Sequence, residues 1–373
     1  MIPNLFDESF GPDDSTSPGD TLREVLERLG LSQSDLAERT GRPKKTINEI
    51  VQGKAAITPE TALQFERVLR IPASFWLNLE RAYRASAARK EESTHLAQHL
   101  SWLDTIPVKE IAKRGWIKPQ SDRIELLREV LTFFGIAYPA AWNEVWKETR
   151  QVTALRQGRS DRIDFGAIAV WLRKGELEGR MRACQSYDPE TFREVLKYAR
   201  TITALPAERF CVELQQRCAS VGVALVFVPE LARLRIFGAA RWLSPEKALI
   251  QLSLYYKRED QLLFSFFHEA AHILLHGRRE IFVDFADPID DKQEVEANRF
   301  AADHLIPPHA YSRFVARGNY AESAVLTFSR ELGIAPGIVV GRLQHDKEIG
   351  FNRLTHLRRT VGWSSHGAVI RVA

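Results

Sequence analysis

The stretch HEAAH at residues 268–272 constrains this 373-residue chain more than any other feature. Nothing from residue 260 to residue 276 breaks a helix, and on a helix His268 and His272 lie one turn apart, so both imidazoles can reach one ion. Glu269 points about 100° further around the axis, where it can take a proton from a water at that ion. These residue types suit zinc and the metal-assisted hydrolysis of an amide. The alternative is a pair of histidines at the edge of a core on an amphipathic helix.

A third metal ligand is expected later in the chain. A histidine six residues after His272 would fit one known arrangement, but Arg278 occupies that position. The other arrangement takes a carboxylate from a later helix, and residues 291–305 have helical spacing. On that helix Glu294 shares a stripe with small and apolar residues, whereas Glu296 lies on a charged stripe that faces water. We therefore expect Glu294 to be the third ligand, the alternative being an ordinary surface charge.

Two further side chains lie near this predicted site. Asn298 follows Glu294 by one turn and is placed to hydrogen-bond a metal ligand from behind. His276 lies on the same side of its helix as His272, which makes it a rival ligand. Its position in the last turn, just before Gly277, favours instead an interaction with free backbone carbonyls and the helix dipole.

The region from about Val223 to Pro308 resembles the ImmA/IrrE family of zinc metallopeptidases. The matching segments are ALVFVPEL, GAARWL, ALIQLSL, FSFFHEAAHILLHG and EVEANRFAADHLIP. The resemblance implies a zincin-like core in which a small sheet packs on two ligand-bearing helices. It also implies a Zn²⁺ cofactor, with Glu269 as general base and with the zinc ligands His268, His272 and Glu294.

The same resemblance implies a protein substrate. Members of the family cleave DNA-binding repressors, often ones with a helix-turn-helix domain. In zincin-like folds an extended substrate pairs with an edge strand of the sheet, and the candidate strand here is Ala248 to Leu254.

A second, independent signal lies in the N-terminal part. Helices are expected over 21–29, over 33–39 and from about Pro43, with Ser32 as a capping residue and Gly53 ending the third helix. Three short helices in this arrangement predict a helix-turn-helix with the third as recognition helix. Lysines suit phosphates or guanine edges, an asparagine can pair with adenine, and a helix start can contact phosphate. The candidate DNA-contacting residues are Gln33, Lys44, Lys45, Thr46 and Asn48.

The segment LSQSDLAERTGRPKKTINEIVQGKAAITPETALQFERVL resembles the HigA-like antitoxin branch of the XRE superfamily. The resemblance implies double-stranded operator DNA as a partner. A homodimer is expected, because one such module covers only a half-site. The alternative is a helical scaffold that no longer binds DNA or that mediates only dimerisation.

Composition indicates an intracellular protein. The cysteines Cys184, Cys211 and Cys218 are odd in number and form no CxxC pair, which is typical of reduced thiols in a cytosol. No stretch approaches a membrane span, and the acidic N-terminus is no signal peptide. We therefore expect a cytoplasmic location without membrane contact. The net charge of +4 is too small to name a partner.

The fold class expected is mainly α with a small sheet (α+β), combining an all-helical helix-turn-helix domain with a zincin-like metallopeptidase domain. Within the middle of the chain, 124–134 and 191–203 read as helices, and Trp142 and Trp146 as core residues. A helix at 208–219 and strands at 223–228 and 249–254 should precede the helix that carries His268 and His272. The predicted boundaries are a disordered arm at 1–18, the helix-turn-helix domain at 19–95, a helical linker or middle domain at 96–205, and the peptidase domain with a helical C-terminal tail at 206–373.

These signals together predict a DNA-binding transcriptional regulator with a zinc-dependent endopeptidase domain. Its substrate would be a repressor- or antitoxin-type protein, or the chain itself, in a stress or toxin–antitoxin-like response. One alternative is a HigA-like repressor or antitoxin whose metallopeptidase domain is inactive and only senses zinc or binds a partner. Another is an enzyme whose helix-turn-helix merely docks a protein substrate. Retention of Glu269 favours an active site, since a fold that only holds metal could lose that base without harm.

Overall fold

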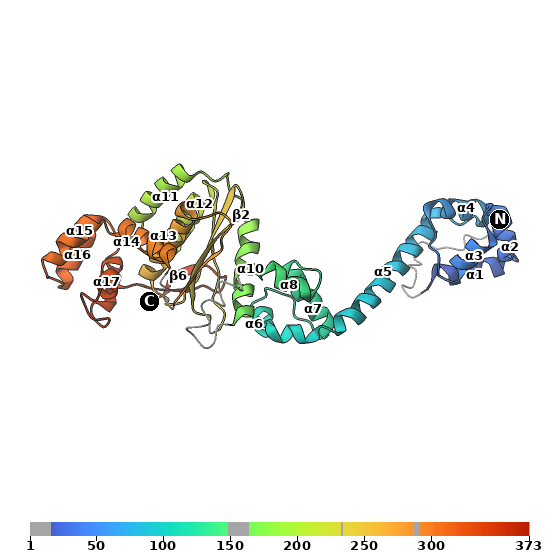
Figure 1. Ribbon diagram of the computed structural model, residues 1–373, viewed down its shortest axis with the longest axis horizontal. Coiled ribbons are helices and arrows are strands. Elements are labelled where there is room, and N and C mark those ends of the chain that lie inside the picture. The colour runs from blue at the N-terminus through green and yellow to red at the C-terminus, as the bar shows by residue number, and fades with distance from the viewer. Residues whose placement is uncertain (1–15, 148–163, 233, 287–290, 373) are drawn as a thin grey trace. The chain divides into compact units, whose positions relative to one another are not determined.

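The computed structural model describes residues 16–147, 164–232, 234–286 and 291–372 (Figure 1). The chain divides into two compact units, Met1–Leu100 and Ser101–Ala373. The described residues are mainly helical with small sheets, which confirms the predicted α+β class. The arm predicted at 1–18 lies outside the described residues up to residue 15, and Pro18 already belongs to the first helix.

The first unit is helical throughout its regular structure. Ser17 caps the first helix and Pro18 takes its first position, so this helix begins one turn earlier than the sequence suggested. Ser32 and Asp35 form a capping box at the second helix, and Pro43 is the N-cap of the third helix and not its first residue. The helices are α1 (Pro18–Leu29), α2 (Gln33–Thr40), α3 (Lys44–Val51), α4 (Pro59–Leu69) and α5 (Ala73–Ala97).

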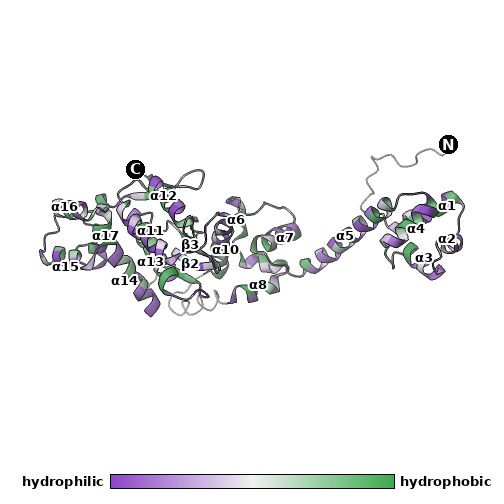
Figure 2. Cartoon of the chain, turned by 90° about the horizontal axis from the view of Figure 1, so that it is seen from above, coloured by the Kyte–Doolittle hydropathy of each residue, from purple (hydrophilic) through white to green (hydrophobic). Residues whose placement is uncertain are grey.

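The apolar core of the first unit fixes α3 against its neighbours. Leu22, Ile47, Phe65 and Trp76 are fully buried, and the rings of Phe65 and Trp76 meet edge to face at 5.5 Å. A Cβ at Gly19 would lie 2.3 Å from the Val51 carbonyl oxygen, so α1 approaches the end of α3 closely. The outer face of α3 is left to solvent. Much of α5 beyond this core is exposed and hydrophilic (Figure 2).

The second unit begins with helices and contains the aromatic core that the sequence indicated. Trp142 and Trp146 are each 4% exposed, which confirms that they are core residues. The Trp142 ring meets Trp102 at 5.9 Å and Phe134 at 6.1 Å, both edge to face. The elements are η1 (Leu100–Thr105), α6 (Val108–Lys113), α7 (Arg123–Phe134), α8 (Pro139–Val145), α10 (Phe165–Met181), α11 (Pro189–Thr201) and α12 (Ala207–Ala219).

A four-stranded sheet forms the centre of the second unit. Its strands are β1 (Val223–Phe227), β2 (Ile236–Ser244), β3 (Lys247–Leu252) and β4 (Phe282–Phe285), in the order β1-β3-β2-β4. β1 and β3 are parallel, and β2 pairs antiparallel with β3 and β4. The expectation that Ala248 to Leu254 would be a substrate-binding edge strand is wrong, because β3 is paired on both sides and has no open ladder.

Helices cover both faces of this sheet (Figure 1). On one face lies α10, where the Gln251 amide donates to the Trp171 carbonyl at 2.7 Å and Arg241 pairs with Glu176 at 3.2 Å. On the other face lies α13 (Glu259–Leu275), in one apolar cluster with Ile250. α14 (Lys292–Leu305) packs against α13. α13 therefore packs on one face of the sheet, with α14 alongside it.

The C-terminal part is α-helical only as far as His345. It comprises α15 (Pro308–Ala316), α16 (Glu322–Leu332), α17 (Pro336–His345), η2 (Thr355–Leu357) and a hairpin of β5 (Thr360–Trp363) and β6 (Val369–Val372). The predicted helical tail is thus wrong at its end. The chain before β5 binds the start of α13, since the Glu259 amide donates to the Arg359 carbonyl at 3.0 Å and Arg358 pairs with Asp260 at 2.7 Å.

Among the described residues, no single helix has both the length and the apolar character needed to cross a membrane. The consecutive helices α16 and α17 reach that length and composition only when taken together, across a bend of 115°.

Candidate metal centre and DNA-contacting helix

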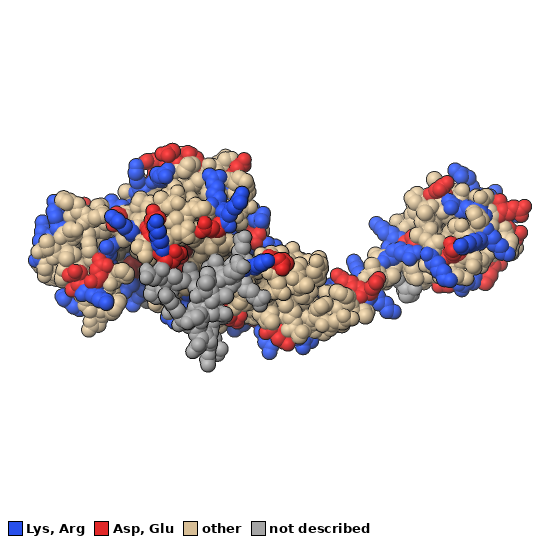
Figure 3. Space-filling model, in the orientation of Figure 1, with Lys and Arg blue, Asp and Glu red and all other residues tan. Residues whose placement is uncertain are grey.

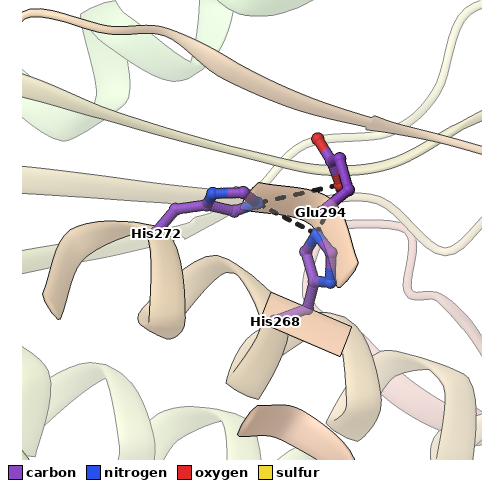
Figure 4. A group of neighbouring side chains, drawn as sticks. All are labelled: His268, His272 and Glu294. Atoms are coloured by element: carbon purple, nitrogen blue, oxygen red, sulfur yellow. Dashed lines mark hydrogen bonds and ion pairs between the residues drawn. The ribbon is translucent and has the colours of Figure 1, made fainter. Parts of the chain in front are cut away.

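Three side chains predicted to bind metal converge between α13 and α14 (Figure 4). His268 Nε2 lies 3.1 Å from His272 Nε2 and 3.2 Å from Glu294 Oε2, and His272 Nε2 lies 3.8 Å from the same carboxylate oxygen. The two histidine side chains are 1% exposed and that of Glu294 is 10% exposed. The helical spacing of the histidines and the inward stripe of α14 bring these groups together, as the sequence suggested.

The donor set and its spacing fit a zinc ion. Ligand bonds of about 2.0–2.1 Å in a tetrahedron place neighbouring ligand atoms about 3.3 Å apart. The three separations of 3.1, 3.2 and 3.8 Å bracket that value. Two imidazoles and one carboxylate leave a fourth position of a tetrahedron for water or substrate, which is typical of a catalytic site and not of a structural one.

The proposed general base is buried beside these ligands. Glu269 is fully buried, and it lies under β2 where that strand has no side chain. A Cβ added at Gly238 would lie 2.4 Å from Glu269 Oε1 and 2.8 Å from its Cγ. Gly238 therefore provides the space that the Glu269 side chain occupies.

The environment of His268 favours the protonated, positively charged form of its imidazole. Burial disfavours the charged imidazole, but the hydrogen bond to Glu294 and the negative charge of Asp284 outweigh burial, so the pKa of His268 lies above its ordinary value of 6.5. Zinc binds the neutral imidazole, so a metal ion and a proton compete for this position.

The second ring nitrogens of the two histidines have separate partners. His268 Nδ1 lies 3.0 Å from Asn298 Oδ1, which is the contact expected for Asn298. His272 Nδ1 lies 2.8 Å from His276 Nδ1. The interpretation of His276 as a side chain that satisfies free carbonyls is wrong. α13 ends at Leu275, and His276 continues in extended backbone with its ring against His272.

Three residues that line this site were missed in the sequence. Gly238 faces Glu269, the Phe282 ring stacks on His272 at 4.1 Å, and Asp284 offers a carboxylate oxygen within 4.8 Å of ligand atoms of His268 and Glu269. A glycine inside a strand is a signal of close approach, and it could have identified Gly238. Phe282 and Asp284 are on β4, a four-residue strand too short for a reliable pattern.

The predicted DNA-contacting residues lie on the outer face of the first unit. Lys44, Lys45 and Asn48 on α3 are exposed, and Thr46 and Gln33 are half-buried. Lys45 Nζ is 3.8 Å from Glu49, and the Gln52 amide donates to Asn48 Oδ1 at 3.2 Å. Basic and acidic side chains are interspersed over the visible surface of this unit (Figure 3). Contact of these residues with DNA stays a prediction.

Comparison with known proteins identifies both parts. The family model described as helix-turn-helix matches residues 22–76, and the model described as an IrrE N-terminal-like domain matches residues 239–344. Virulence-associated protein A of Dichelobacter nodosus is 35% identical over 95 residues, which are 25% of this chain and 89% of that protein. An uncharacterised HTH-type transcriptional regulator, YddM of Escherichia coli, is 34% identical over 73 residues, 20% of this chain and 78% of its own.

Among solved structures, an antidote protein of the HigA family from Coxiella burnetii is 31% identical and covers 22% of this chain and 91% of its own, with a TM-score of 0.21. The two family matches describe a helix-turn-helix domain followed by a metallopeptidase-type domain, and the paired histidines lie within the second match. The chain belongs to the XRE-type helix-turn-helix family through its N-terminal part, and its C-terminal part is similar to the IrrE-like family over residues 239–344.

Proposed function

We propose that this chain is a DNA-binding transcriptional regulator whose C-terminal domain is a zinc-dependent endopeptidase. The observation that carries the enzymatic half is the convergence of His268, His272 and Glu294 at tetrahedral spacing, with Glu269 buried beside them. The match to the IrrE-like family supports a metallopeptidase-type domain independently of that geometry.

The residues divide the work of amide hydrolysis between them. When bound, zinc polarises the scissile carbonyl and lowers the pKa of water. His268, His272 and Glu294 would hold the ion. Glu269 takes the proton from the attacking water and passes it to the leaving amine. Burial keeps bulk water from competing for Glu269, and the absent side chain at Gly238 lets the carboxylate remain in place.

The regulatory half of the proposal rests on the first unit. Its helix-turn-helix matches relatives named as transcriptional regulators, and α3 presents Lys44, Lys45 and Asn48 to solvent. We propose that α3 enters the major groove of an operator and that the chain acts as a homodimer, one module to each half-site. The proposed substrate is a repressor- or antitoxin-type protein, or the chain itself, cleaved in a stress or toxin–antitoxin-like response.

Metal content and one carboxylate substitution test the enzymatic half. The purified chain should carry about one zinc, and His268→Ala, His272→Ala and Glu294→Ala should each abolish it. Glu269→Gln should keep the zinc and the fold but lose proteolysis by about a hundredfold or more, because only the proton acceptor is removed. The measurements are metal analysis and the appearance of discrete fragments, from the chain alone and from candidate repressors, which a chelator suppresses.

The alternative of an inactive, zinc-sensing repressor gives the opposite result in cells. There Glu269→Gln would reproduce wild-type regulation and leave the proteome unchanged under stress, while the ligand substitutions would alter regulation. Zinc loss in Glu296→Ala together with retention in Glu294→Ala would overturn the assignment of the third ligand.

A further inference from the structure

The two histidines of the proposed zinc site are held from behind by chemically different partners. His268 Nδ1 faces the amide oxygen of Asn298 at 3.0 Å, and an amide oxygen can only accept a hydrogen bond. His272 Nδ1 faces His276 Nδ1 at 2.8 Å, and an imidazole nitrogen can donate or accept. Asn298 therefore fixes the tautomer of His268 by itself, whereas the tautomer of His272 depends on the state of His276.

Metal binding through Nε2 sets the direction of this second contact. His272 Nε2 faces His268 and Glu294, so it must be free of hydrogen to bind an ion, and the ring proton lies on Nδ1. His272 Nδ1 then donates and His276 Nδ1 accepts. A neutral His276 consequently has its own proton on Nε2, and that nitrogen faces Glu296 Oε2 at 3.5 Å. The hydrogens thus point in one direction, from His272 through His276 to the Glu296 carboxylate.

The packing around His276 supports a specific role for its ring. The His276 side chain is only 4% exposed, although Glu296 at the end of the series is 55% exposed. Phe282 stacks on the His272 ring at 4.1 Å and 17°, and the same Phe282 ring lies 5.3 Å from His276. The Phe282 ring covers one side of the contact between the two imidazoles, and removal of His276 takes away the acceptor that His272 Nδ1 has there.

We propose that His276 and Glu296 are positioning residues for zinc, acting through His272. They hold the His272 ring in the orientation and in the tautomer that leave Nε2 free for the ion. Histidine ligands are generally held in this way by a group behind them, and loss of such a group weakens metal binding about 10–100-fold. The inference rests on the proposed zinc site and assigns a function to two residues outside its ligand set.

Zinc affinity of the full chain, measured by competition with a chelator, tests the proposal. His276→Ala should keep about one zinc at saturation but bind it about 10–100-fold more weakly. His276→Gln should restore much of the affinity, since its amide oxygen can accept from His272 Nδ1. Glu296→Ala should have a smaller effect in the same direction. His304→Ala is the matched control, because His304 is a partly buried histidine of α14 whose Nδ1 bonds to the carbonyl of Phe300, and it should leave the affinity unchanged.

A second readout comes from the zinc-loaded chain. In long-range ¹H–¹⁵N spectra the His272 Nδ1 proton should exchange slowly with water in the wild type and in His276→Gln, and fast in His276→Ala. Equal zinc affinities of wild type and His276→Ala, or equal losses in His276→Ala and His276→Gln, would overturn the inference while leaving the zinc site intact. A wild-type chain that binds no zinc would overturn the proposed function and the inference that rests on it.

Discussion

A single methyl group at position 238 should separate the position of the general base from the binding of metal. The Cβ of Gly238→Ala would lie 2.4 Å from Glu269 Oε1, 2.8 Å from its Cγ and 2.9 Å from its Cδ. Ordinary van der Waals contact begins near 3.4 Å, so the Glu269 carboxylate must move by about 1 Å. A displacement of that size at a reacting group costs about a hundredfold in rate. Overpacking of the buried site should also cost about 1–3 kcal/mol of stability.

The assay compares three quantities in Gly238→Ala and a control. We expect zinc content near the wild-type level, because the metal ligands lie on α13 and α14 and not on β2. Unfolding in denaturant should show the stability loss, and the rate at which discrete fragments form from the chain or from a candidate repressor should fall about a hundredfold. Gly179→Ala is the control, since its Cβ would lie 2.8 Å from Leu249 Cδ1 on the opposite face of the sheet. A wild-type cleavage rate in Gly238→Ala, or equal rate losses in both variants, would refute the reasoning.

Two further predictions concern stability and DNA. Burial, only partly offset by the charge of Arg359, raises the pKa of Glu259 to about 7. Between about pH 4.5 and 7 the folded chain therefore retains a proton that the unfolded chain releases, and the free energy of unfolding falls as the pH rises through this window. The rise in pKa from 4.5 to about 7 corresponds to about 3 kcal/mol of unfolding free energy. In denaturant unfolding, Glu259→Gln should therefore be more stable than wild type by up to that amount at pH 8 and should show no gain below pH 4.5. A constant difference at all pH values would contradict this prediction. Lys44→Ala and Lys45→Ala should each weaken binding to the promoter of the chain's own operon and lower the salt slope by about one, whereas Lys90→Ala on α5 should not. If full-length protein ignores that promoter at low salt, the regulatory half of the proposal fails.

The local parts of the candidate site could be predicted because helical geometry repeats over a few residues. The four-residue spacing of His268 and His272 places them on one face of any helix, and the composition of α14 indicates Glu294 as the inward carboxylate. The capping of α2 by Ser32 and Asp35 is equally local, since the residues that form it are three positions apart. The helix-turn-helix family and the α+β class followed from such local signals.

The remaining features depend on contacts between segments far apart in the chain. β3 and an edge strand have the same alternation, so only the order β1-β3-β2-β4 excluded Ala248 to Leu254 as a docking strand. The packing of β2 over Glu269 requires residues 238 and 269 to meet.

His276 illustrates the division between sequence and tertiary structure at the end of one helix. The sequence placed it one turn beyond His272, on the side that faces the proposed metal. Its partner was decided by the backbone, which leaves the helix after Leu275, and by Phe282 on β4, which covers both rings. Spacing along a helix fixes direction, whereas hydrogen bonding and burial depend on which distant elements pack against that direction.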